Sequence, residues 1–233
     1  EPAALRVVEV GPLEQGRVAM SPADLTAFFQ RFASARLILE VGGQSPWVSR
    51  LAQAAGMEVI VANPRRVQLI TRNERKNDRT DAELLARLGR VDPQLLSPVT
   101  HRSVEHQADL AVKRARDAAV ASRTALINHV RGAIKSFGHR LPTCSPDSFH
   151  TRVMARLPVE LAPALQPIVR LISQFTGEIK NFDAQIEELA DERYPVTKVL
   201  RQVSAVGPVT ALSFVLTLDN PARVSDSRQV GPY

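Results

Sequence analysis

The most constraining feature of this sequence is a run of apolar residues spaced alternately by four and three. Its members are Leu161, Leu165, Ile168, Ile172, Phe175, Ile179, Phe182, Ile186 and Leu189. Heptad spacing puts them on one side of an α-helix, and that side must be covered by another helix. Pro163 and Pro167 fall near its start, where a proline removes a backbone hydrogen bond. The pattern predicts an antiparallel helix pair, a coiled coil or both, and this helix is our candidate dimerisation element.

A second long helix is predicted just before it. The stretch from about Val104 to Phe137 contains no Gly or Pro before Gly132 and is rich in strong helix formers. A linker rich in Pro, Ser and His follows at 138–150. The two long segments are therefore suited to form the pair that the heptad spacing requires.

A third helical segment begins near Tyr194 and contains VSAVGPVTALSF. This stretch predicts two helices joined by a tight Gly-Pro turn. The turn resembles a helix-hairpin-helix, in which Gly207 would offer backbone N–H to a phosphate. Ala205 stands where that motif usually has its first glycine, and a plain turn between two helices is an equally good interpretation.

The first hundred residues instead predict an α/β arrangement. LRVVEV (5–10) and GRVAM (16–20) are short β-rich runs around a turn, as in a hairpin. RLILEV (36–41) and MEVIVA (57–62) are continuous apolar runs, typical of strands buried on both faces. Ser21-Pro22 and Ser45-Pro46 each open a helix, and Gly56 should stop the second. Strand, helix and strand with short connections imply a parallel pair.

The composition indicates which kinds of partner the chain can bind and in which cellular compartment it is expected. Lys and Arg number 30 against 24 Asp and Glu, so the chain suits anionic partners such as a phosphate backbone. The single cysteine, Cys144, cannot form a disulfide within the chain, which favours a reducing cytoplasm. No apolar run approaches the roughly 18 residues that a membrane span requires. We therefore expect a cytoplasmic protein without a membrane partner.

Basic residues gather between positions 60 and 80. The candidate nucleic-acid contacts are Arg65, Arg66, Arg72, Lys76 and Arg79. Aromatic residues make up only 5% of the chain, so contacts to the phosphate backbone are expected rather than stacking of bases on aromatic rings.

Two aspartates lie among these cations, and they allow two interpretations. Asp78 and Asp81 could cap a helix that Gly89 would end, because carboxylates favour a helix N-terminus. Capping is the commoner role for such residues.

Alternatively, the i, i+3 spacing of Asp78 and Asp81 lets both carboxylates reach one point. Glu40 ends a buried strand and precedes Gly42-Gly43, a position suited to a ligand. Converging carboxylates of this kind suit Mg²⁺ or Mn²⁺, which would serve phosphodiester chemistry.

Several blocks of the sequence resemble one family closely. They are LILEVGGQSPWVSRLAQAAGMEVIVANPRRVQLI, RKNDRTDAELLARL, INHVRGAIKSFGHRLP, the heptad helix, and VSAVGPVTALSFVLTL through VGPY. Together they resemble the insertion-sequence transposases that join an N-terminal RuvC-like DEDD domain to a C-terminal serine domain, the bridge-RNA-guided recombinases. The resemblance covers essentially the whole chain, and NDRTDAE is its most specific block.

The resemblance implies a role for each candidate acid. Glu40 would be the glutamate of the DEDD set, and Asp78 and Asp81 its last two acids. The fold would be RuvC-like, within the RNase H-like group, and a bound Mg²⁺ or Mn²⁺, DNA, a guide RNA and a homodimer or higher homo-oligomer would be its partners. The family's first aspartate would precede residue 1, since Glu9 lies on the wrong strand. Its catalytic serine would follow residue 233, since Ser225 and Ser227 lie too early.

The expected organisation has three parts: a RuvC-like domain lacking its first strand at 1–100, a helical coiled-coil region at 101–193 and the start of a helical C-terminal domain at 194–233. We expect a DNA transposase cut at both ends, and inactive or nearly so in this form. Two alternatives stay open: a nucleic-acid-binding remnant without catalysis, and a RuvC-like junction nuclease that needs the acids but no serine.

Overall fold

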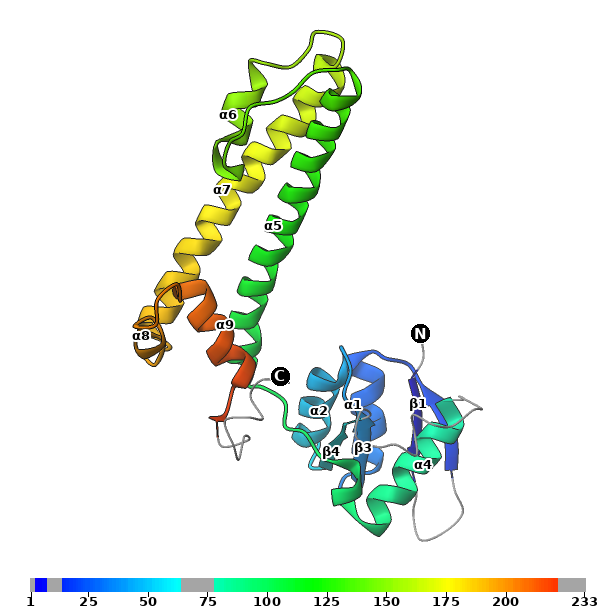
Figure 1. Cartoon of the computed structure of the whole chain (residues 1–233). Coiled ribbons are helices and arrows are strands. Elements are labelled where there is room, and N and C mark those ends of the chain that lie inside the picture. Colours follow the sequence, from blue (N-terminus) through cyan, green and yellow to red (C-terminus); the bar gives the residue numbers. More distant parts are fainter. Residues whose placement is uncertain (1–2, 8–13, 64–77, 222–233) are drawn as a thin grey trace. The chain divides into compact units, whose positions relative to one another are not determined.

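The computed structural model describes residues 3–7, 14–63 and 78–221, with the side chains of 3–7, 14, 15 and 78–80 left out (Figure 1). The chain divides into two compact units, unit 1 at 1–102 and unit 2 at 103–233. Each unit is described by itself below.

The strands of unit 1 form two separate two-stranded sheets within the described residues. β1 (Ala3–Val7) pairs with β2 (Glu14–Val18) in antiparallel fashion, which confirms the hairpin although β1 begins earlier than predicted. β3 (Arg36–Glu40) pairs with β4 (Glu58–Ala62) in parallel, with Ile38 opposite Ile60. The two apolar runs therefore form the parallel pair that the sequence predicts, although only Leu37 of β3 is buried and the strand is not covered on both faces throughout.

The helices of unit 1 begin where the Ser-Pro pairs predict. α1 (Pro22–Arg31) is capped by Ser21, whose Oγ accepts a hydrogen bond from the Asp24 backbone N–H at 3.1 Å. α2 (Ser45–Ala54) ends just before Gly56, which adopts a left-handed φ of +84°. Leu25 and Phe29 of α1 pack with residues of α2 and β3 in one buried cluster. This cluster covers one side of the parallel pair.

α4 (Asp78–Val91) covers other residues of the same pair, and it corrects one prediction. Gly89 does not end the helix, which continues to Val91 before the short helix η1 (Pro93–Leu96). A Cβ on Gly89 would lie 1.9 Å from Ile38 Cδ1, so the glycine instead lets α4 approach β3 closely. Capping and close packing both favour glycine, and the sequence does not distinguish them.

Unit 2 is built from helices. They are α5 (Val104–Ser136), η2 (Pro146–Ser148), α6 (Phe149–Met154), α7 (Ala162–Glu192), α8 (Thr197–Leu200) and α9 (Pro208–Leu218). α5 and α7 lie side by side along their length (Figure 1). Ile134 near the end of α5 clusters with Leu165 near the start of α7, and Leu110 with Ile186 at the opposite end. The two helices are thus antiparallel, as the heptad spacing predicts.

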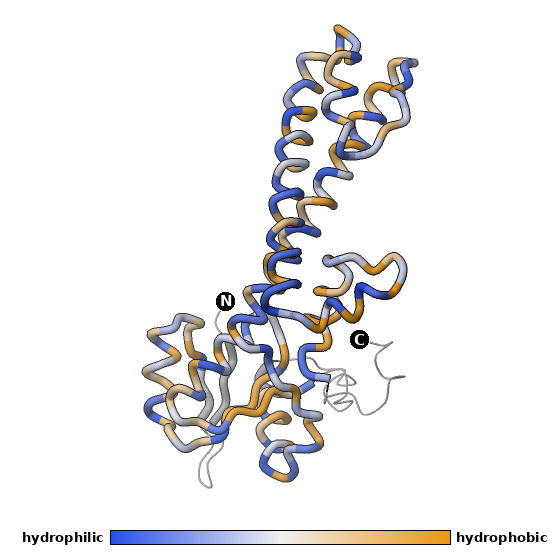
Figure 2. The backbone as a smooth tube through the Cα atoms, turned by 90° about the vertical axis from the view of Figure 1, so that its left-hand side faces the viewer, coloured by the Kyte–Doolittle hydropathy of each residue, from blue (hydrophilic) through white to orange (hydrophobic). Residues whose placement is uncertain are grey.

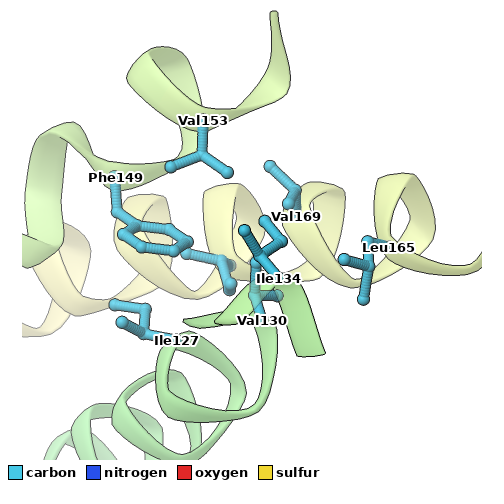
Figure 3. Close-up of a cluster of buried hydrophobic side chains, with 8 residues drawn as sticks. Ile127, Val130, Ile134, Phe149, Val153, Leu165 and Val169 are labelled. Carbon is cyan, nitrogen blue, oxygen red and sulfur yellow. The ribbon is translucent and has the colours of Figure 1, made fainter. Parts of the chain in front are cut away.

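The predicted heptad seam of α7 packs against other helices of the same chain. Every seventh residue of it is buried, namely Leu165, Ile172, Ile179 and Ile186. Hydrophobic and hydrophilic positions alternate along both long helices (Figure 2). The cluster in Figure 3 shows Val130 and Ile134 of α5 facing Val169 of α7, with Phe149 and Val153 of α6 packed over them. Pro167, the sixth residue of α7, lies inside the helix and is exposed.

Candidate metal site and nucleic-acid contacts

Asp81 is the best-described member of the predicted metal site. It lies in the first turns of α4, three residues after Asp78, and the residue is half-buried. Its Oδ1 atom is shielded from solvent and accepts no hydrogen bond from the residues that the structure describes. A buried carboxylate oxygen without a partner costs about 1–3 kcal/mol or more, so a purely structural role leaves this atom unexplained. A cation ligated by the oxygen would account for it.

Glu40 occupies the place that the sequence predicts, at the carboxyl end of β3. Its side chain is exposed. The turn that follows is fixed by Ser45, whose Oγ accepts from the Gly42 N–H at 2.9 Å and donates to the Gly42 carbonyl at 2.8 Å. The strand therefore delivers Glu40 to the sheet edge at which ligands commonly bind in α/β folds.

The contacts between α4 and β3 fix the helix at one end. Gly89 packs against Ile38, and Arg36 donates from Nη1 to the Gly89 carbonyl at 2.9 Å. Asp81 lies eight residues before Gly89, which corresponds to about 12 Å along a helix. Among the described side chains, no group of three acids, histidines or cysteines is close enough to hold a metal. The Asp78 side chain is outside that set, so the convergence of Glu40, Asp78 and Asp81 stays a prediction.

The basic residues predicted to contact nucleic acid mostly lie outside the described part of the chain. Arg65, Arg66, Arg72 and Lys76 fall within 64–77, and Arg79 is described only through the backbone of α4. Their role stays a prediction. Glu9, Ser225 and Ser227 are likewise outside the described residues.

The two predicted helices are α8 and α9, but residues 201–207 connect them, a longer connection than the tight turn that the sequence predicts. Gly207 precedes α9 with an extended backbone, and a Cβ added to it would meet no atom within 4 Å. Its backbone is therefore open to approach. Ala205 has a left-handed φ of +68°, the conformation for which glycine is favoured. At the position where the motif usually has glycine, the backbone is therefore left-handed even though the residue is alanine.

Ala205→Gly is therefore expected to stabilise unit 2 by about 0.5–1 kcal/mol. The left-handed region costs an alanine about 1–2 kcal/mol, and the greater freedom of unfolded glycine offsets part of the gain. Urea denaturation would measure it. As a control of opposite sign, Ala184→Gly on the exposed side of α7 should cost about 1 kcal/mol. Destabilisation by both substitutions would contradict a strained Ala205.

Among the described residues, no helix is both long enough and apolar enough to cross a bilayer.

Comparison with known proteins identifies the family. Residues 11–138, more than half of the chain, match the family model of the IS110-type DEDD transposases, described as "Transposase". The IS1111A insertion-element transposase of Coxiella burnetii is 26% identical over 200 residues, which cover 82% of this chain and 53% of that protein. A probable family 20 transposase of Pseudomonas aeruginosa is 26% identical over 228 residues, covering 93% and 65%.

A putative transposase of Sinorhizobium fredii, y4pF/y4sB, is also 26% identical, over 224 residues that cover 93% of this chain and 56% of that protein. The chain thus spans between about half and two thirds of the length of these relatives. The predicted resemblance to insertion-sequence transposases is confirmed. The chain belongs to the DEDD transposases of the IS110 family.

Proposed function

We propose that this chain is part of an insertion-sequence recombinase in which Glu40, Asp78 and Asp81 together hold Mg²⁺ or Mn²⁺. The observation that carries the proposal is the buried, unpartnered Oδ1 of Asp81. Carboxylate oxygens are the ligands that these hard cations prefer. The exposed Glu40 at the carboxyl end of β3 would supply a second oxygen donor, and Asp78 shares a helix face with Asp81.

The chain's own residues would bind and orient the reacting DNA strand. A divalent cation at this position would stabilise negative charge on the oxygens of a phosphodiester. Arg65, Arg66, Arg72, Lys76 and Arg79 would hold the neighbouring phosphates, and Gly207 would offer backbone N–H to the backbone of nucleic acid. Strand exchange by the whole protein, guided by RNA, is the activity that we infer for the intact recombinase.

A homo-oligomer is part of this proposal, but the heptad helix is a poor candidate for its contact. Four residues of the apolar seam are already buried within the same chain, and the other five are half-buried. We therefore expect an oligomer to use surfaces other than this seam.

The metal site can be tested on the 233-residue chain by titrating Mn²⁺ calorimetrically. Asp81→Asn and Glu40→Gln should each weaken Mn²⁺ binding at least about tenfold, since even residues behind metal ligands cost about 10–100-fold. Without metal, Asp81→Asn should melt at the same temperature as the wild type or higher, because a buried unpaired charge is removed. Glu160→Gln, an exposed acid in unit 2, is the matched control and should leave Mn²⁺ affinity unchanged.

Unchanged Mn²⁺ affinity in Asp81→Asn would leave Asp81 a helix-capping residue and would favour the alternative of a nucleic-acid-binding remnant. The second alternative, a junction nuclease, differs in its product. A nuclease would leave hydrolysed ends on a labelled four-way junction, whereas a recombinase would join them to new partners.

A further inference from the structure

Charge is separated along unit 2. Between residues 131 and 170 the chain has six Lys and Arg but two acids, whereas between 171 and 200 it has three Lys and Arg and six acids. The basic segment includes the end of α5, the connection to α6, α6 itself and the start of α7. α6 lies at the end of the α5–α7 pair at which this connection passes (Figure 1). We name this surface the basic end, defined by Lys135, Arg140, Arg152 and Arg156.

The cations of the basic end are not neutralised by neighbours. Lys135, Arg140, Arg152 and Arg156 are all exposed. None of them forms an ion pair with another described residue. Of the two acids nearby, Asp147 accepts a hydrogen bond from Arg123 at 2.6 Å. The surface therefore presents uncompensated positive charge, which attracts a polyanion.

An exposed aromatic residue lies between two of these cations along the chain. Phe137 is 55% exposed and lies two residues after Lys135 and three before Arg140. The end of α5 holds it in place. The His139 N–H donates to the Ile134 carbonyl at 3.2 Å, and Gly138, with a φ of +81°, donates to the Lys135 carbonyl at 3.0 Å. A large apolar ring held on the surface in this way has no role in the core.

We propose that the basic end binds an unpaired strand of nucleic acid, with Phe137 stacking on a base and the surrounding cations contacting phosphates. The proposal rests on the proposed function, since it assumes a protein that handles nucleic acid. Bases inside a duplex are already stacked on each other and cannot lie flat on a side chain, whereas unpaired bases can. The low aromatic content of the sequence predicts backbone contacts alone; Phe137 adds a stacking surface to them.

Fluorescence anisotropy on the 233-residue chain in EDTA would test the stacking role. The probes are labelled oligouridine and oligothymidine of about 20 nucleotides, longer than the roughly 4–16 nucleotides that one single-strand-binding fold occupies, and a duplex of equal length. Phe137→Ala should weaken binding of the unpaired probes about 5–100-fold and leave the duplex nearly unchanged. Phe137→Tyr, which keeps the ring, should retain wild-type affinity. A difference between the two unpaired probes would show whether RNA or DNA is the preferred strand.

The phosphate contacts have a separate readout. Replacing Arg140, Arg152 and Arg156 by Gln should lower the salt dependence of unpaired-strand binding by about two units of log–log slope, since each single-strand phosphate contact contributes about 0.7. Lys180→Gln combined with Lys198→Gln removes exposed cations elsewhere in unit 2 and should change the slope little.

Three results would overturn the proposal: equal affinity for unpaired and duplex probes, an unaltered affinity in Phe137→Ala, or a salt-sensitive self-association that Phe137→Ala abolishes while strand binding persists. The last would identify a second copy of the chain as the occupant. Because EDTA removes divalent metal, failure of the proposed acid site leaves these outcomes unaffected, and failure here leaves the Mn²⁺ titration unaffected.

Discussion

Replacing Phe149 by alanine is expected to lower the free energy of unfolding of unit 2 by about 3–5 kcal/mol. Phe149 is fully buried and joins side chains of α5, α6 and α7 in one cluster (Figure 3). The Arg131 guanidinium also lies 5.2 Å from the centre of its ring. Alanine would remove these contacts and leave a cavity where three helices meet. No neighbouring helix can close such a cavity without losing its own contacts.

Hydrogen exchange followed by mass spectrometry in urea would assign the effect to a unit. Phe149→Ala should lower the protection of α5 and α7 and leave that of α1 and α2 unchanged. Phe29→Ala, at a fully buried site in unit 1, should lower the protection of α1 and α2 and leave that of α5 and α7 unchanged. Val159→Ala is the control within unit 2, since Val159 is 78% exposed, and should cost less than about 0.5 kcal/mol. Loss of protection in both units from either core substitution would show that they unfold together.

The local architecture could be predicted from the sequence where one physical cause dominates. Continuous apolar runs at 36–41 and 57–62 predict a parallel pair, and the structure contains it, although only Leu37 of β3 is buried. The heptad spacing of α7 requires a covering helix, and α5 is long enough to be that helix. In each case the periodicity of apolar residues and the lengths of the connections leave few arrangements.

Prediction failed where two causes favour the same residue. Gly89 fits a helix end, but it is the contact point of α4 on Ile38, which depends on a strand fifty residues earlier. The left-handed φ of Ala205 is a different case, because its residue type disfavours this conformation and the sequence left two interpretations of the turn open. Contacts between residues far apart in the chain cannot be predicted from the local sequence.

The acids of the candidate site stay predictions. They could be named because Glu40 ends an apolar strand and because the i, i+3 spacing of Asp78 and Asp81 puts both on one helix face. The orphaned Oδ1 of Asp81 could not be foreseen, because it depends on which side chains pack around α4. The exposed position of Phe137 was not predicted, because it depends on where α5 ends and on the path of the chain from there to α6.

The second large effect is expected at the other end of the helix pair, where Asp109 anchors the α8–α9 segment. Asp109 is buried in α5 and accepts from Tyr194 Oη at 2.7 Å and Arg193 Nη1 at 2.8 Å. Asp109→Ala should cost about 2–4 kcal/mol, because the buried Tyr194 hydroxyl loses its charged acceptor. The Arg193 bond adds little, since its side chain is 46% exposed and screened by solvent.

Asp117→Ala is the matched control on the same helix. Its carboxylate pairs with Lys113 at 2.6 Å but is 45% exposed, so its loss should cost under about 1 kcal/mol. Urea denaturation would measure both substitutions. Hydrogen exchange should show the Asp109→Ala effect first in α9, whose Leu212 and Leu216 pack in the same cluster as Tyr194. Equal costs for the two aspartates would contradict the anchoring role.

The same network makes the stability of unit 2 depend on alkaline pH. Burial, followed by the hydrogen bond to Asp109, raises the pKa of Tyr194 above its ordinary value of 10.0. Folding therefore favours the neutral phenol. Its contribution is complete below about pH 10, where the unfolded tyrosine is neutral too, and is lost as the pH rises further. The phenylalanine of Tyr194→Phe cannot ionise, so between about pH 9 and 11 this variant should lose less free energy of unfolding than the wild type. Equal losses in the two proteins would contradict a buried, neutral Tyr194 hydroxyl.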